Sequence, residues 1–325
     1  MNESSVSPYV YNRTTTSRPT SQPALSHTTF ATGRQKLLGH LAMVAFAALV
    51  AGSFSFGAIA APDLSPAALN AARFAIGTGV MAGVALAMAR GRIGRPHAVW
   101  RFGVLGALMA VFFITMFIAL QFTDPVSTGA VFTLMPVASA GFGFLFLGQV
   151  PRGAVVASLA LAALGSLWVV FRGDLHALAR FDVGRGELIF FVGVLGHAAY
   201  GPLLRRFNRG EEGVVFTLWT VAATGLCIAA WGFRDVLATG WSDLSPAVWL
   251  TILYLGTFTS GGTFFLTQYA SMRLTAAKVL AYSYLTPVFI ILYEGLLGHG
   301  WATMTVVVGA AVIVLGLVVM AFARD

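Results

Sequence analysis

The chain has 325 residues, of which 58% are hydrophobic and only 10% are charged, and its mean hydropathy is +0.82. A soluble domain carries roughly 25% charged residues, so this composition excludes a large water-facing surface and indicates a polytopic membrane protein. The net charge of +8 does not indicate a nucleic-acid binder, because the basic residues lie in short segments between apolar runs. A single cysteine, Cys227, excludes an internal disulfide and a metal site built on several cysteines.

Residues 1–35 are rich in Ser, Thr and Pro and lack apolar periodicity, so we expect a disordered cytoplasmic tail. From Leu37 onward, apolar runs long enough to cross the hydrocarbon core as helices recur. Helices are expected because lipid cannot satisfy the hydrogen bonds of an open backbone. We predict ten spans, at 37–61, 67–89, 102–122, 126–147, 154–171, 187–204, 214–233, 247–269, 279–297 and 302–322.

The distribution of Arg and Lys predicts the orientation of the spans. With a cytoplasmic N-terminus, 15 of the 20 basic residues fall in inside segments and 4 in outside loops, while Arg73 lies within a span. Both termini are then cytoplasmic. The predicted location is the inner (plasma) membrane of a bacterium.

Two segments, 125–149 and 276–300, share one pattern: small residues at the start, a central proline, and an ending in Leu-Gly plus a polar residue. The two prolines, Pro136 and Pro287, lie 151 residues apart. This spacing indicates an internal duplication, with halves at 36–172 and 186–323. Five spans in each half is an odd number, so the halves enter the membrane from opposite sides. The predicted fold is therefore an all-α membrane protein whose ten transmembrane helices form two inverted five-helix repeats, a transporter architecture.

Several stretches in this order resemble the drug/metabolite transporter superfamily, specifically its EamA-type members. They are AGSFSFGAIAAPDLSPAALNAARFAIG (51–77), ALQFTDPVSTGAVFTLMPVASAGFGFLFLGQ (119–149), HAAYGPLLRRF (197–207) and QYASMRLTAAKVLAYSYLTPVFIILYEGLLGHG (268–300). The chain departs from the family pattern where Leu-Gly-Glu is replaced by Leu-Gly-Gln at 147–149 and Leu-Gly-His at 297–299. The resemblance implies a secondary transporter of small metabolites and names no substrate.

Three of the ionisable residues inside predicted spans are candidates for a function. A charge there is costly and is a functional hypothesis by default, but for Arg73 we favour a structural role over substrate contact. His197 is a candidate proton site or substrate hydrogen-bonder, with simple packing as the alternative. Glu294 is the candidate for proton coupling, because a partly desolvated carboxylate can bind protons; the alternative is an interfacial Glu facing water.

Polar residues within the spans are candidates to line a substrate cavity. The eighth span holds the most polar, Gly-rich stretch, and the alternative for its hydroxyl groups is close helix packing. The full set of cavity candidates is Ser53, Arg73, His197, Tyr200, Thr259, Ser260, Gln268, Tyr282, Ser283 and Tyr284. Kinks are expected at Pro136, Pro202 and Pro287, because proline removes a backbone donor.

The chain carries no Walker A motif, HExxH, paired CxxC or GxSxG, so no cofactor, no metal and no catalytic residue is predicted. The predicted function is export of small organic metabolites, amino acids or related compounds, by alternating access between the repeats. The alternatives are an integral-membrane enzyme that modifies lipid, and a non-transporting scaffold or sensor. The expected partners are a small-molecule solute and membrane lipid, without nucleic acid, in a monomer or homodimer.

Overall fold

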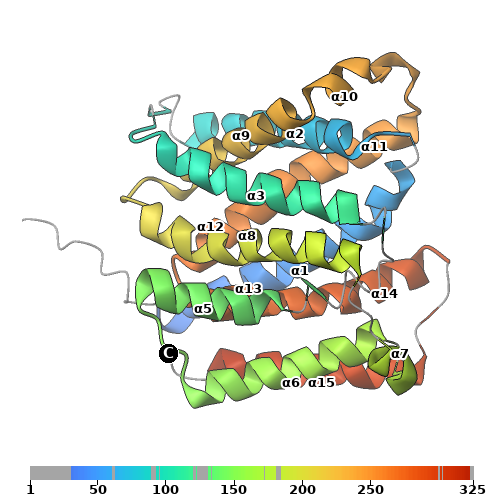
Figure 1. Cartoon of the computed structure of the whole chain (residues 1–325). Helices are drawn as coiled ribbons and strands as arrows, with labels where there is room; N and C mark the ends of the chain where they lie inside the picture. The colour runs from blue at the N-terminus through green and yellow to red at the C-terminus, as the bar shows by residue number, and fades with distance from the viewer. Residues whose placement is uncertain are drawn as a thin grey trace, which may run out of the picture.

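The structure is a computed structural model, and Figure 1 shows its helices lying side by side in a stack. It describes residues 31–60, 63–88, 93–94, 96–119, 122, 131–132, 134–171, 173–180, 184–298, 301 and 303–322. The predicted tail therefore falls outside the described residues up to position 30. Within the described ranges every regular element is helical, which confirms the all-α prediction.

The first half of the chain contributes α1 (Gly33–Ala60), α2 (Pro66–Met88), α3 (Trp100–Ala119), α5 (Met135–Leu147), α6 (Gly153–Val170) and the short α7 (Leu175–Ala179). The second half begins with α8 (Arg185–Phe207), α9 (Gly213–Trp231), α10 (Phe233–Ala238) and the 3₁₀ turn η1 (Trp241–Asp243). It continues with α11 (Pro246–Tyr254), the π-helical η2 (Leu255–Gly262) and α12 (Thr263–Ser271). It ends with α13 (Ala276–Ala281), the 3₁₀ segment η3 (Tyr282–Leu285), α14 (Thr286–Leu296) and α15 (Met304–Phe322).

In the described residues, seven helical stretches are long and apolar enough to cross a membrane, and α5 and α6 are shorter apolar helices. Ten spans were expected. The eighth predicted span is divided into α11, η2 and α12, and for the fourth the described helix begins only at Met135 because residues 123–130 lie outside the described ranges. Large apolar side chains also cover the outer faces of the helices, including Phe144, Leu145 and Leu226. Such a surface suits a lipid surrounding.

Two helices begin with the same five residues, Asp-Leu-Ser-Pro-Ala, at 63–67 and 243–247. In each, the serine caps the helix: Ser65 Oγ accepts from the N–H of Ala68 at 3.2 Å, and Ser245 Oγ accepts from the N–H of Val248 at 3.4 Å. Proline follows at the first helical position, where its missing N–H costs nothing. The repeated cap starts both α2 and α11, and the first turns of the two helices contribute to one apolar cluster.

Helices α2 and α9, from different halves of the chain, run antiparallel. A Cβ added to Gly232 would lie 2.2 Å from the Cβ of Ala67, and one added to Gly225 would lie 3.0 Å from the Cβ of Phe74. Residue numbers therefore increase along one helix in the direction in which they decrease along the other. The two glycines allow the backbones to approach closely, as small residues do between membrane helices.

Helices α6 and α15 form a second antiparallel pair, seen side by side in Figure 1. The indole Nε1–H of Trp168 donates to the carbonyl of Thr305 at 3.0 Å, where α6 ends and α15 begins. Further along the pair, near the middle of α6, a Cβ on Gly316 would meet the backbone nitrogen of Ala162 at 3.0 Å. In both pairs, helices at corresponding places in the two halves run in opposite directions.

Pro136 and Pro287 stand in the first turn of α5 and α14, where each helix follows a non-α turn. They do not interrupt a continuous α-helix, as a kink in mid-span would. The residue before each of these helices has nearly the same backbone angles, with φ −77° and ψ −15° at Leu134 and φ −76° and ψ −15° at Leu285. These two leucines are 151 positions apart, the same spacing as the prolines. Pro202, by contrast, lies inside the unbroken helix α8.

Candidate functional site

A polar part of the interior lies where α2 crosses η2. Two glycines make this approach possible: a Cβ on Gly256 would lie 2.7 Å from the Cβ of Ile76, and one on Gly77 would lie 2.9 Å from the carbonyl oxygen of Gly256. The η2 segment is π-helical, a conformation that is rare and frequent at functional sites. The close contact brings the hydroxyl groups of η2 against α2.

Arg73 of α2 binds these hydroxyl groups. Its Nε donates to Ser260 Oγ at 3.0 Å and its NH2 group donates to Thr259 Oγ1 at 2.7 Å. The Thr259 hydroxyl itself donates to the carbonyl of Leu255 at 2.8 Å, which leaves its oxygen oriented to accept. Arg73 is only 1% exposed, so this guanidinium lies inside the bundle and does not reach an interface. Three of the predicted cavity residues thus form one cluster.

Six aromatic rings form a closed circuit beside Arg73. Successive ring centroids are 5.1 Å apart for Phe113–Phe112, 4.6 Å for Phe112–His197, 6.3 Å for His197–Tyr200, 5.7 Å for Tyr200–Phe264, 5.6 Å for Phe264–Phe74 and 5.0 Å for Phe74–Phe113. All six residues of this circuit are buried. The rings come from α2, α3, α8 and α12, so both halves of the chain contribute. We call this set the aromatic circuit.

The guanidinium carbon of Arg73 lies 4.8 Å from the ring centroid of Phe113 and 5.7 Å from that of Phe74. Ring faces attract a cation, so two members of the circuit stabilise the charge from one side. The NH1 group of Arg73 has no hydrogen-bond partner among the described residues. A buried donor on a charged group is therefore still open next to the circuit.

Two further buried polar groups adjoin the circuit with open atoms. His197 is 5% exposed, and its Nδ1 has no hydrogen-bond partner in the described part of the chain. Gln268 is 2% exposed, follows Phe264 by one turn of α12, and has neither amide atom bonded there. Buried polar atoms are nearly always hydrogen-bonded in folded proteins, so the open atoms of Arg73, His197 and Gln268 point to ligand or water contacts at these side chains.

The predicted residues of the ninth span form a separate polar group on η3. The hydroxyl of Tyr282 lies 2.8 Å from Nδ1 of His40 on α1. The hydroxyl groups of Ser283 and Tyr284 are buried and without a partner in the described ranges. Ser53 is half-buried on α1. Among the predicted cavity residues, the structure thus groups Tyr282, Ser283 and Tyr284 on η3, while Arg73, Thr259 and Ser260 form the cluster between α2 and η2.

Glu294 belongs to α14, but its side chain lies outside the described residues, so its predicted role in proton coupling stays a prediction. A different acidic residue, Glu187, is buried in the first turn of α8. The sequence prediction placed it at the very start of the sixth span and gave it no role.

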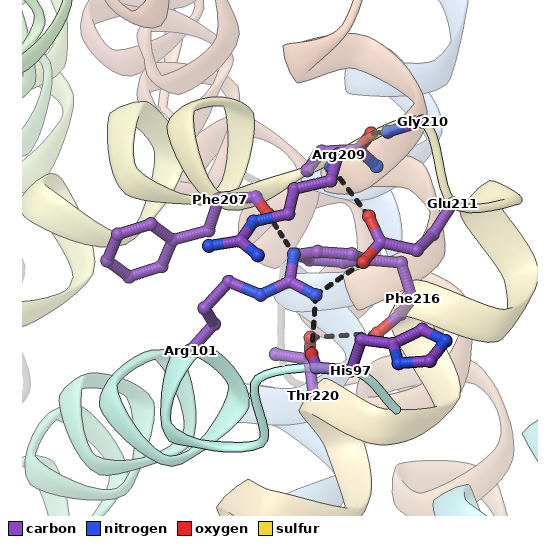
Figure 2. Close-up of polar contacts among 9 residues, drawn as sticks. His97, Arg101, Phe207, Arg209, Gly210, Glu211, Phe216 and Thr220 are labelled. Carbon is purple, nitrogen blue, oxygen red and sulfur yellow. Dashed lines mark hydrogen bonds and ion pairs between the residues drawn. The ribbon is translucent and has the colours of Figure 1, made fainter. Parts of the chain in front are cut away.

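A second polar cluster, shown in Figure 2, links α3 to the α8–α9 loop. Arg101 donates from NH2 to Glu211 Oε1 at 2.5 Å and to the carbonyl of His97 at 2.7 Å, and from NH1 to the carbonyl of Phe207. Glu211 Oε2 accepts from the backbone N–H of Arg209 at 2.6 Å. Partial burial opposes ionisation of Glu211, but the hydrogen bonds from Arg101 and Arg209 outweigh it and hold the pKa of this carboxyl below its ordinary value.

Sequence reasoning counted Arg101 and Lys278 as loop cations, and the structure corrects this. Arg101 is buried in the first turn of α3, and Lys278 is fully buried in α13. Each lies within a residue or two of a predicted span boundary, so a small shift of the helix end changes an exposed charge into a buried one.

A family model matches the chain twice, at residues 37–171 and 184–322, and its description is "EamA-like transporter family". This chain belongs to the EamA-like transporter family. It is therefore an integral membrane protein of a transporter family, and the resemblance seen in the sequence is confirmed.

A curated relative of the EamA-like chain is "Uncharacterized transporter YyaM" from Bacillus subtilis (strain 168). It is 22% identical over 283 residues, which cover 77% of this chain and 92% of the relative. A crystal structure of another protein superposes with a TM-score of 0.72 at 24% identity, and it covers 90% of this chain and 99% of the other. At that identity the superposition establishes the shared fold alone.

The EamA-like chain has Gln149 where the family pattern ends in Glu, and the structure gives this residue a local role. Its Oε1 accepts from the backbone N–H of Ala276 at 3.1 Å, at the start of α13. Ser139 Oγ also lies 3.4 Å from the carbonyl oxygen of Ala276. The end of α5 is therefore hydrogen-bonded to the first turn of the helix that copies its pattern.

Proposed function

We propose that this EamA-like protein is a secondary transporter that exports small organic metabolites, amino acids or related compounds. The solute would bind at the aromatic circuit and the cluster of Arg73, Thr259 and Ser260. Two halves of opposite direction would alternately open this site to either side of the membrane.

The observation that carries the proposal is the origin of the circuit. Two of its helices, α2 and α3, lie in the first family match, and two, α8 and α12, lie in the second. In transporters built from inverted repeats the substrate binds at the interface of the repeats, and broken helices supply its polar contacts. The π-helical η2 is such an irregular segment, and it provides the two hydroxyl groups that hold Arg73.

Alternating access requires that contacts between the halves break at one end at a time. Arg101 of the first half binds Glu211 of the second, and Arg206 of the second half donates to the carbonyl of Phe146 in the first at 3.0 Å. Arg273 likewise donates to Gln35 Oε1 at 3.0 Å. We propose that these contacts close the cytoplasmic end in this conformation.

For energy coupling, both a proton gradient and the solute's own gradient remain candidates. Glu294 is the proposed proton-binding residue in the first case. Proton-coupled flux that becomes independent of the pH gradient in Glu294→Gln supports this role, and unchanged coupling in that variant removes it.

Reconstituted proteoliposomes test transport directly. A panel of labelled amino acids and other small organic acids and amines is offered, and empty liposomes give the background. We expect saturable flux of at least one solute, strongly reduced in His197→Ala and unchanged in Leu226→Ala, whose side chain is exposed on the outside of α9. Absence of saturable flux across the panel, or flux insensitive to His197→Ala, contradicts the proposal.

We also propose that the membrane is the bacterial inner membrane and that both termini face the cytoplasm. Labelling of a cysteine placed at either terminus, in a Cys227→Ser background, tests the orientation with a membrane-impermeant maleimide. Labelling of intact spheroplasts contradicts it, and labelling only after lysis supports it.

A further inference from the structure

We infer that the solute carries a carboxylate, which binds the open edge of Arg73, and a flat apolar body, which lies among the rings of the aromatic circuit. This inference rests on the proposed function and narrows its substrate class. It depends on four features of the described residues: the open donors of Arg73, the lack of an acidic partner, the open polar atoms of His197 and Gln268, and the aromatic rings beside Arg73.

The donors of Arg73 can be counted. A guanidinium has five N–H groups, one on Nε and two on each terminal nitrogen. One on Nε and one on NH2 are used by Ser260 and Thr259, and NH1 uses none among the described residues. Two parallel donors on a planar fork match the two oxygens of a carboxylate, the geometry in which Arg binds such groups most strongly.

The charge of Arg73 has no acidic partner in the described part of the chain. Its contacts there are two neutral hydroxyl groups and two ring faces. A buried cation without a counter-ion is costly, and an anion that enters the site offsets this cost. Arg101 shows the contrast, because its guanidinium already binds Glu211 and has two carbonyl oxygens as further acceptors.

Two other side chains with open atoms, one in the circuit and one a helical turn beyond it, can bind the rest of the solute. Nδ1 of His197 and the amide of Gln268 have no partner in the described ranges, and both side chains are more than nine-tenths buried. His197 packs against Phe112, and Gln268 follows Phe264 by one turn. The circuit itself is aromatic, so it favours a flat body with few polar atoms.

Matched pairs of compounds that differ only in the head group test the inference. Phenylacetate is compared with phenylacetamide, and phenylalanine with phenylalaninamide, by the concentration of each that half-maximally raises the melting temperature of the purified full chain in detergent. We expect at least one acid to bind about tenfold or more tightly than its amide, the ratio for one hydrogen bond to a charged group.

Arg73→Met is expected to abolish the preference for the acid, and Arg73→Lys, which keeps the charge without the planar fork, to reduce it. Arg180→Gln is the matched control, because Arg180 is exposed after α7, and it should keep the preference. If Arg73→Met does not fold, the acid-to-amide preference measured for Arg73→Lys decides the test. Equal binding of acids and amides, no binding by any of the four compounds, or an unchanged preference in Arg73→Lys overturns the inference.

Failure of the inference and failure of the proposed function give different results. Acid-selective binding with no flux of any solute in proteoliposomes keeps the carboxylate site and contradicts transport. Saturable flux of amides or amines, without preference for acids, keeps transport and contradicts the carboxylate site.

Discussion

Nε of Arg73 lies 3.0 Å from Oγ of Ser260, and this bond joins residues 187 positions apart in the chain. Both side chains are buried, so the serine oxygen replaces water as the hydrogen-bond acceptor for one N–H group of the guanidinium. The bond fixes the guanidinium in one orientation, and NH1 has no hydrogen-bond partner among the described residues. Such pre-organisation lowers the cost of binding an anion.

Ser260→Ala should destabilise the protein by about 1–3 kcal/mol, because it leaves a buried charged donor without its acceptor. In an Arg73→Met background the same serine change should have almost no effect, since the donor is gone. Thermal or denaturant unfolding in detergent of the four proteins measures the coupling. An equal loss in both backgrounds would show that Ser260 stabilises η2 independently of Arg73.

Gly256→Ala should destabilise the crossing of α2 and η2 by about 1–3 kcal/mol, the usual cost of overpacking. The added Cβ would lie 2.7 Å from the Cβ of Ile76 and 2.8 Å from the carbonyl oxygen of Arg73, so backbone must move. Gly79→Ala on α2 is the control, because a Cβ there meets nothing within 4 Å. Melting temperatures compare the two variants, and equal effects would contradict close approach at Gly256.

Tyr282→Phe should cost about 1–2 kcal/mol, because it removes the hydroxyl that lies 2.8 Å from Nδ1 of His40 in a buried site. Tyr284→Phe is matched in size and burial, but its hydroxyl has no partner among the described residues. It should therefore be neutral or stabilising. If the two substitutions lower the melting temperature equally, the His40–Tyr282 bond contributes nothing specific.

Glu211→Gln should remove a pH-dependent part of the stability. The pKa of Glu211 is lower in the folded chain than its ordinary value of 4.5, so the carboxylate stabilises the fold above that value. This contribution declines as the pH falls below 4.5 and is lost when it passes the folded pKa. Melting temperatures from pH 7 to pH 3 should therefore fall less steeply for Glu211→Gln than for the unchanged protein.

Glu212→Gln is the control for this pH series, because Glu212 is exposed and makes no side-chain cap for α9. Its acid profile should match that of the unchanged protein. A steep acid loss that persists in Glu211→Gln would mean that other carboxylates determine the profile. At neutral pH, Glu211→Gln should lower the free energy of unfolding by about 1–3 kcal/mol, because Arg101 is left with a neutral partner.

The sequence alone determined the class of protein, the helical fold and the family. The length and hydropathy of an apolar run are local properties that determine whether a segment can cross the membrane as a helix. They can therefore be taken directly from the sequence. The duplicated pattern around Pro136 and Pro287 was readable for the same reason, and the matching turns at Leu134 and Leu285 follow from the local effect of proline. The repeated Asp-Leu-Ser-Pro-Ala segment is also present in the sequence, but only the structure shows that it begins two helices that pack together.

Only the tertiary structure decided which polar residues meet. Arg73 and Thr259 were both candidates, but the distance between them depends on how closely α2 and η2 approach, and glycines on both helices set that approach. The burial of Arg101 and Lys278 could not be predicted from the sequence either. A basic residue at the end of a predicted helix is assigned to the loop whichever way its side chain faces. Hydropathy is a sum over one segment, whereas a binding site depends on contacts between segments far apart in the chain.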